Sequence, residues 1–185
     1  MIVRPAALAG VWTVESERVV DERGWFERVF DADVFAANGL CTAFPQHGQA
    51  HNRLRGTVRG LHYQTEPHGE IKVIRCTRGA AYDVLVDVRP ESSSFGRWLA
   101  FELHADRSLA LYVESGFAHG YKTLADDTDF QYLISARYQP DAARGYAYDS
   151  PELAIAWPPG EAIISARDRA LPPLLRGGGS SGIDQ

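Results

Sequence analysis

The chain has 185 residues, 45% of them hydrophobic, which is enough to bury one sizeable core. Its net charge of −5 is the reverse of the basic excess typical of general nucleic-acid binders, so we expect no nucleic-acid partner. No apolar run approaches the roughly 20 residues needed to cross a membrane, and residues 1–10 lack a signal-peptide pattern. The two cysteines, Cys41 and Cys76, provide no disulfide framework and favour a reducing cytoplasm.

The first element predicted along the chain is a short helix from Asp31 to Asn38, which Gly39 ends. The segment from Arg55 to Gln64 and the segment from Ile71 to Ile74 then have the character of strands. A glycine inside a strand often marks a bulge or a close backbone approach, and Gly60 occupies such a position. A bulge there would turn the side chains on both sides of it into one cavity.

Alternating patterns continue through the middle of the chain. Apolar residues recur at every second position from Tyr82 to Val88, from Leu99 to Leu103 and from Phe130 to Ile134, a spacing that predicts strands with two distinct faces. A second short helix is predicted over Asp106 to Leu109. Short strands separated by turn residues predict an all-β fold, a double-sheet jelly roll with a few short helices. We expect one domain over residues 1–176, followed by a flexible Gly/Ser-rich tail over residues 177–185.

Several segments carry residues suited to proton transfer. Arg59 and His62 flank Gly60, and Lys72 interrupts an apolar strand, where an unpaired ammonium would be expensive. Lys72 therefore lies either at a sheet edge or in a polar pocket. Further along, the chain presents a histidine between glycines, a phenol on an apolar strand and a carboxylate after an apolar run, namely His119, Tyr132 and Asp168. Together these residues supply a base, an acid, a cation and an orienting carboxylate.

A metal-dependent cupin is a competing interpretation. Such proteins bind their metal through a His-x-His pair, a nearby glutamate and a later histidine. This chain has His62-Tyr63-Gln64, then Glu70 and His119, and the glutamine is a poor ligand for zinc or iron. We therefore expect no metal and no other cofactor, although a three-ligand site from His62, Glu70 and His119 stays open.

The order of several motifs resembles the dTDP-4-dehydrorhamnose 3,5-epimerase family from about residue 10 to residue 175. The segments that carry this resemblance are Asp21–Phe26, Arg59–Gln64, Asp83–Arg89 followed by Phe95-Gly96, Gly116–Gly120 and Ala154–Pro158. The resemblance implies a homodimeric, cupin-like jelly roll (a double-stranded β-helix) without a metal. It also implies a nucleoside-diphosphate 4-keto-6-deoxyhexose as substrate.

The resemblance further implies roles for individual residues. His62 matches the general base, Asp168 the carboxylate that orients it, Tyr132 the general acid and Lys72 the cation beside the C4 oxygen. The remaining matches are to substrate-binding residues: Arg59 and His119 in the sugar and phosphate pocket, Arg23 and Phe26 in a segment that contacts nucleotide across the dimer, Gln46 at the nucleotide, and Tyr138 near the sugar.

Two departures from the family pattern concern the substrate. Arg28 stands where a glutamate is usual, and Gly48 stands where an asparagine is expected. Both lie near the expected nucleotide and sugar pocket, so the nucleotide, the sugar and the number of inverted carbons stay open. The alternatives to a 3,5-epimerase are inversion of C3 or C5 alone, a 3,4-ketoisomerase, and a sugar-binding jelly roll without catalytic activity.

Overall fold

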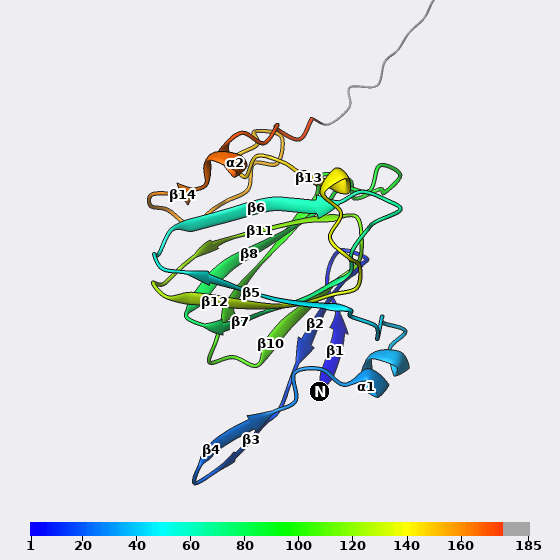
Figure 1. The fold of residues 1–185 in the computed structure, drawn as a ribbon, viewed down its shortest axis with the longest axis vertical. Coiled ribbons are helices and arrows are strands. Elements are labelled where there is room, and N and C mark those ends of the chain that lie inside the picture. Colours follow the sequence, from blue (N-terminus) through cyan, green and yellow to red (C-terminus); the bar gives the residue numbers. More distant parts are fainter. Residues whose placement is uncertain (176–185) are drawn as a thin grey trace, which may run out of the picture.

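The protein, described here from a computed structural model over residues 1–175, is built on two antiparallel sheets that face each other (Figure 1). The first sheet has six strands in the order β1 (Ile2–Pro5), β2 (Val11–Glu15), β10 (Leu109–Val113), β7 (Lys72–Arg78), β12 (Thr128–Ile134) and β5 (Gln46–Asn52). The second runs β13 (Ala143–Gly145), β6 (Thr57–Gln64), β11 (Phe117–Thr123), β8 (Ala80–Asp87) and β9 (Trp98–His104). The two-residue β14 (Ile163–Ile164) pairs in parallel with β6. This architecture confirms the predicted all-β class.

The main core lies between the two sheets. Its fully buried members come from strands of both sheets and include Ile74, Leu85, Leu111 and Phe130. Burying such side chains stabilises the fold by roughly 1.5–3 kcal/mol each. The alternating pattern of strand β8 is typical of a strand with one face exposed to water, but β8 has no such face. Its aspartates alternate with apolar residues, yet both faces are covered and Asp83 and Asp87 are fully buried.

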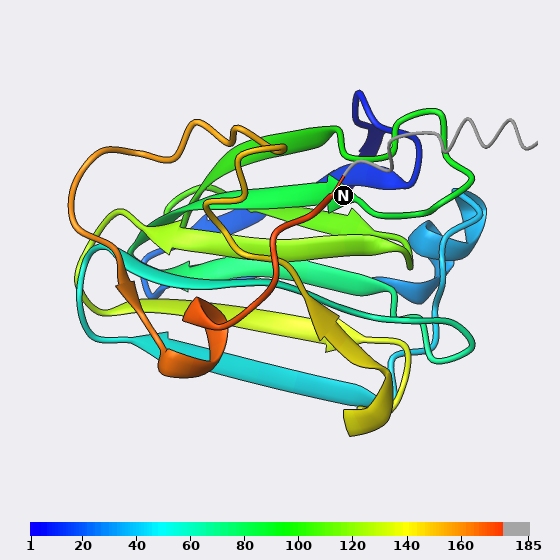
Figure 2. The same cartoon turned by 90° about the horizontal axis from the view of Figure 1, so that it is seen from above.

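The C-terminal segment covers the outer face of the second sheet (Figure 2). Leu153 and Leu174 pack there against Val84 and Val86 of β8. The segment also contains the helical turn α2 (Ala166–Arg169), whose N-cap Ser165 accepts a hydrogen bond from the backbone N–H of Asp168 at 3.1 Å. Packing on β6 therefore brings the end of the described chain beside a strand that lies far earlier in the sequence.

The helix α1 (Ala32–Ala37) confirms the first predicted helix. Asp31 caps it by accepting hydrogen bonds from the backbone N–H groups of Asp33 and Val34, and Gly39 ends it with a φ of +70°. Its buried Phe35 packs on the outer face of the first sheet. The second predicted helix was wrong. Residues 105–108 form the turn between β9 and β10, closed by a hydrogen bond from the Arg107 N–H to the His104 carbonyl, and Leu109 is already the first residue of β10. The short polar segment reverses the chain instead of continuing as a helix.

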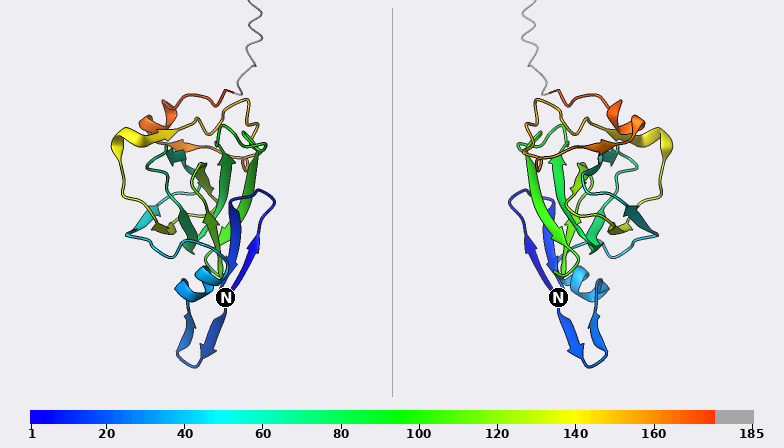
Figure 3. Two further views of the ribbon diagram at one scale, coloured as in Figure 1. Left: turned by 90° about the vertical axis from the view of Figure 1, so that its right-hand side faces the viewer. Right: turned by 90° about the vertical axis from the view of Figure 1, so that its left-hand side faces the viewer.

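A separate hairpin of β3 (Arg18–Asp21) and β4 (Gly24–Glu27) projects from the sheets at the end opposite the C-terminal segment (Figure 3). Its base is fixed by the Glu27 carboxylate, only 2% exposed, which lies 3.2 Å from Arg18 and 3.6 Å from Arg75 of β7. Its apolar side chains are far more exposed, at 63% for Val19, 73% for Val20, 56% for Trp25 and 65% for Phe26. Within residues 1–175, both faces of this ribbon therefore carry exposed apolar side chains.

Candidate active site

Three of the four predicted catalytic side chains, those of His62, Lys72 and Tyr132, line a cavity of about 260 Å³ between the sheets. Its walls come from β5, β7 and β12 of one sheet and from β6 and β11 of the other. The lining residues are Ala50, Arg59, His62, Glu70, Lys72, His119, Tyr121, Tyr132, Ile134 and Tyr138. Ligand sites for drug-sized molecules usually span roughly 300–1,000 Å³, so this cavity suits a sugar ring better than a whole nucleotide sugar.

Gly60 brings Arg59 and His62 to the same cavity, as the bulge prediction required. Its φ is +111°, and a Cβ there would lie 2.6 Å from the Cα of Gly120 on the neighbouring strand. The register between β6 and β11 shifts at this point, between His119 and Tyr121. Only a residue without a side chain permits this approach of two backbones. The resulting irregularity lets the side chains of Arg59 and His62 both face the cavity.

His62 is held by a carboxylate from the far end of the described chain. Its Nε2 lies 2.8 Å from Oδ1 of Asp168 in α2, and Oδ2 of the same carboxylate accepts a hydrogen bond from the Gly60 N–H. The Asp168 side chain is 7% exposed, whereas that of His62 is 41% exposed. Burial lowers the pKa of His62 below 6.5, and Lys72 and His119 lower it further, while Asp168 acts in the opposite direction. The imidazole is therefore neutral at neutral pH and able to accept a proton.

Lys72 lines the cavity and does not lie at a sheet edge, because β7 is paired on both sides. Its ammonium lies 2.7 Å from Oε1 of Glu70, and both side chains are 13% exposed. The sequence pattern does not indicate this pairing, since it suggests Glu70 only as a metal ligand. The ion pair reduces the cost of burying the ammonium and fixes it at the cavity wall.

Tyr132 occupies the wall supplied by β12, with its ring 6.1 Å from that of His119. Burial raises its pKa well above 10, so the phenol keeps its proton at all moderate pH values. Three further side chains, those of Tyr121, Asn52 and Arg59, are joined by hydrogen bonds. Asn52, which is 2% exposed, accepts a hydrogen bond from Tyr121 at 3.2 Å and another from Arg59 at 2.9 Å. Neither Asn52 nor Tyr121 was predicted, and no motif in the sequence marks them.

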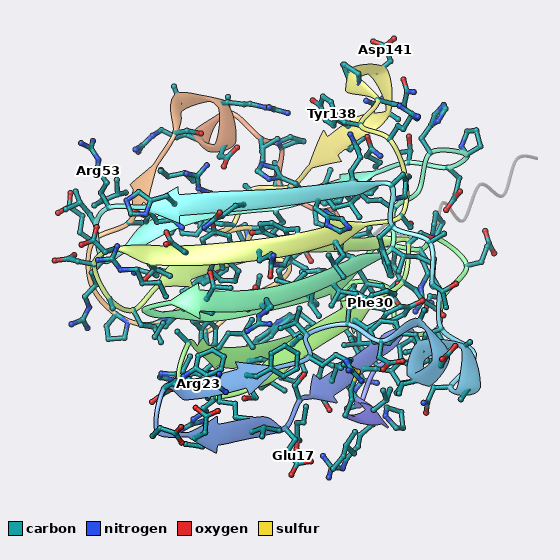
Figure 4. The ribbon with its side chains drawn as sticks, turned by 60° about the horizontal axis from the view of Figure 1, so that its bottom comes forward. Glu17, Arg23, Phe30, Arg53, Tyr138 and Asp141 are labelled. Carbon is teal, nitrogen blue, oxygen red and sulfur yellow. The ribbon has the colours of Figure 1, made fainter. Side chains whose placement is uncertain are left out.

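Three predicted binding residues lie outside the cavity wall. Gln46 accepts a hydrogen bond from the backbone N–H of Tyr138 at 2.9 Å and so holds the loop that carries this lining tyrosine. Arg23 and Phe26 belong to the projecting hairpin, and Figure 4 shows Arg23 and Tyr138 on opposite sides of the molecule. A single chain therefore does not bring the hairpin to its own cavity.

The two departures from the expected pattern occupy different places. Arg28 is exposed and pairs with Asp31 at 3.3 Å near the hairpin. Gly48 lies on β5 directly opposite Tyr132, and a Cβ at this position would meet no atom of residues 1–175 within 4 Å. The missing side chain therefore leaves open space on β5 at the position that pairs with Tyr132.

The residues of the conceivable three-ligand metal site share the cavity but are otherwise engaged. The Nε2 atoms of His62 and His119 face Asp168 and Asp83, and Glu70 pairs with Lys72. Within residues 1–175, no group of three or more His, Cys, Asp or Glu side chains is placed to hold a metal ion. In the same range, no helix is both long enough and apolar enough to span a bilayer.

Comparison with known proteins decides the family. The family model described as dTDP-4-dehydrorhamnose 3,5-epimerase matches residues 5–176. The chain belongs to the dTDP-4-dehydrorhamnose 3,5-epimerase family. This confirms the resemblance noted in the motifs, and the fold is accordingly a cupin-like jelly roll. A dTDP-4-dehydrorhamnose 3,5-epimerase of Sinorhizobium fredii is 37% identical, covering 94% of this chain and 90% of the relative.

Two further relatives of the epimerase family bear on substrate and outcome. A crystal structure of the 3,5-epimerase of Bacillus anthracis with TDP and PPi bound has a TM-score of 0.90 and 35% identity, covering 94% of this chain and 99% of its own. A dTDP-4-dehydrorhamnose 3-epimerase of Streptomyces niveus is 36% identical, covering 91% of this chain and 82% of the relative. The family thus includes proteins named for two inversions and proteins named for one.

Proposed function

We propose that the protein is an isomerase that epimerises a nucleoside-diphosphate 4-keto-6-deoxyhexose at carbon next to the C4 ketone. The observation that carries this proposal is the meeting of His62, Lys72 and Tyr132 in one sugar-sized cavity, with Asp168 behind the histidine. Family membership and the dTDP-sugar names of the relatives support the substrate class.

His62 serves as the base. A C–H bond beside a ketone is acidic enough for a side chain to break, because the electron pair left on carbon delocalises onto the ketone oxygen as an enolate. The imidazole takes the proton at Nδ1, since Nε2 faces Asp168 at 2.8 Å. The carboxylate then stabilises the imidazolium, as the acidic partner does in hydrolase triads. Asp168 is thus a positioning residue.

Lys72 stabilises the enolate. Its ammonium provides a fixed positive charge at the wall of the cavity, where Glu70 holds it. Preorganised donors aimed at developing charge typically account for about 3–4 kcal/mol each. Arg59, whose guanidinium is held by Asn52 at 2.9 Å, is suited to contact phosphate oxygens at the cavity rim.

Tyr132 returns a proton to the other face of the ring. It lies on β12 of the first sheet, whereas His62 lies on β6 of the second, so the two groups approach a bound ring from different sheets. Its raised pKa keeps it protonated until the carbanion forms. Delivery from the face opposite the base inverts the carbon.

Two copies form the working enzyme. The exposed Val20, Trp25 and Phe26 of the hairpin need a cover, because an isolated two-stranded ribbon is at best marginally stable in water. If a second copy supplies that cover, Arg23 and Phe26 reach the nucleotide bound by the partner. The unpaired cysteines, Cys41 and Cys76, support a reducing cytoplasmic setting.

Incubation with a panel of nucleotide 4-keto sugars in deuterated water tests the function. NMR reports which carbon exchanges its proton and which inverts. Exchange and inversion at both C3 and C5 identify a 3,5-epimerase, whereas inversion at C3 alone identifies the single-inversion type that the Streptomyces niveus relative represents. A product with its ketone at C3 indicates a ketoisomerase. No exchange with any member of the panel would contradict the proposal.

A further inference from the structure

A second imidazole–carboxylate pair, of which only the imidazole lines the cavity, has no role in the proposed mechanism. Nε2 of His119 lies 2.7 Å from Oδ2 of Asp83, and the side chains are 7% and 0% exposed. The two residues come from neighbouring strands of the second sheet, β11 and β8. Asp83 lies inside the sandwich beneath the cavity, and it does not line the cavity itself.

The carboxylate of Asp83 is incompletely satisfied. Its second oxygen, Oδ1, is buried and has no hydrogen-bond partner among the residues that the structure describes. An ionised carboxylate in such a place costs free energy, because burial removes its hydrating water and no hydrogen-bond donor takes the place of that water at Oδ1. Burial accordingly raises the pKa of Asp83, and it outweighs His119 and Lys72, which act in the opposite direction. The pair is therefore more stable with one additional proton, as a neutral unit, than as an anion.

A neutral pair has two possible proton arrangements. Either Asp83 is protonated and donates to Nε2, so that the ring proton is on Nδ1, or Asp83 is ionised and His119 carries protons on both nitrogens. Both arrangements place a hydrogen on Nδ1. Only the anionic pair, in which Nε2–H donates to the carboxylate, leaves Nδ1 as an acceptor. Electroneutrality thus decides the hydrogen-bonding character of the opposite side of the ring.

Nδ1 of His119 is accessible from the cavity. The residue lines the cavity wall, and its Nε2 is turned away towards Asp83. Among residues 1–175, Asp83 Oδ1 is the only buried side-chain nitrogen or oxygen without a partner. Nδ1 of His119 makes no hydrogen bond within that range, yet it is not among these buried atoms without a partner. It is therefore exposed, and a ligand in the cavity can reach it.

We propose that Asp83 is a positioning residue that makes Nδ1 of His119 a hydrogen-bond donor to a substrate oxygen in the cavity. The assignment of that oxygen to the ketone, which becomes the enolate oxygen beside Lys72, rests on the proposed function. The donor character of Nδ1 rests only on the buried pair.

Several titratable and charged groups surround the pair. Their own titration would contribute to any pH dependence of the reaction rate. They are Lys72 and Cys76 on β7, Arg59 and His62 on β6, Tyr121 on β11, Tyr132 on β12, and Glu70 just before β7. A site-specific readout at His119 is therefore preferable to a pH–rate profile.

NMR of the ligand-free protein labelled with ¹⁵N-histidine gives that readout. The His119→Gln variant assigns the His119 ring signals by their loss. We expect Nδ1 to show the chemical shift of a protonated ring nitrogen from pH 7 to pH 8. In Asp83→Ala, the Nδ1 and Nε2 tautomers should exchange and give averaged shifts. A wild-type Nδ1 with the shift of an unprotonated nitrogen would overturn the proposal.

Kinetics of three variants then test the consequence for substrate. Asp83→Ala should lower kcat for proton exchange about 10²-fold, the usual effect of removing one donor to developing negative charge, with little change in KM. Asp83→Asn should lose less, because its amide can donate to Nε2 and keep the proton on Nδ1. Equal losses in both variants, or a loss confined to KM, would contradict the positioning role.

Asp87→Asn is the matched control. Asp87 is also fully buried on β8, but it bonds Arg89, Ser92 and Ser94 in a turn outside the cavity. This variant should lose thermal stability and keep the kcat of its folded fraction. The NMR measurement needs no substrate, so it can fail while the wild-type enzyme still exchanges substrate protons. Conversely, an absence of exchange in the wild type would refute the proposed function and leave the His119 measurement unaffected.

Discussion

Nε2 of His62 lies 2.8 Å from Oδ1 of Asp168, a residue 106 positions further along the chain. This contact fixes which ring nitrogen faces the cavity. We expect His62→Ala to lower the rate of substrate proton exchange by roughly 10²–10⁴-fold, the range that a positioned general base contributes. NMR in deuterated water measures the rate. His47→Ala is the control, because His47 lies on β5, a strand of the cavity wall, but is exposed to solvent. Unchanged exchange in His62→Ala would show that another group is the base.

The acidic limb of the pH profile should reflect the lowered pKa of His62. Because the neutral imidazole is the active form, kcat/KM should remain high as the pH falls through 6.5 and decline only below that value. Asp168→Asn removes a carboxylate that raises this pKa, so its limb should move to lower pH while the rate drops. Lys72→Met removes a cation that lowers the pKa, so its limb should move to higher pH. Shifts in the opposite directions would show that the limb belongs to a different group.

Tyr132→Phe should separate the two halves of the reaction. The variant keeps the base and the enolate-stabilising cation, so it should still exchange the substrate proton with solvent. It lacks the phenol that delivers a proton to the other face, so inversion should fall by at least about tenfold more than exchange. The same NMR experiment reports both quantities. Equal losses of exchange and inversion would count against proton delivery from a second face.

Substitution at the hairpin should weaken dimerisation without unfolding the chain. Val20 is 73% exposed in the single chain, so Val20→Lys should fold normally and weaken the dimer. Sedimentation velocity measures the monomer fraction. Leu54→Lys, at an apolar residue that is 51% exposed but outside the hairpin, provides the control. A wild-type protein that sediments as a monomer would remove the basis for nucleotide binding across two chains.

Much of this arrangement could be predicted from the sequence, because strands with alternating residues and a glycine inside a strand leave local signals. The β class, the helix ended by Gly39 and the irregularity at Gly60 are of this kind. The erroneous helix at residues 106–109 shows the limit for short polar segments, which form turns and helical turns with similar composition. The α2 turn was missed for the same reason.

Contacts across strands were harder to predict. Asp83 is one of several aspartates in an alternating pattern, and nothing local indicates that it meets His119. That meeting depends on how β8 and β11 align, which local pattern does not determine. The Lys72–Glu70 pair and the position of Asn52 are further cases, since each depends on which side of a strand faces the cavity. Residue types can be recognised locally, but their partners depend on the three-dimensional pairing.

The apolar residues on both faces of the β3–β4 hairpin have a consequence for heat tolerance. If a second copy covers them, unfolding releases two chains from one particle, and mass action then couples melting to concentration. The melting temperature should therefore rise with the amount of protein in the sample. At high dilution, the apolar side chains of the hairpin would be exposed to solvent, and its strand edges would promote aggregation on heating.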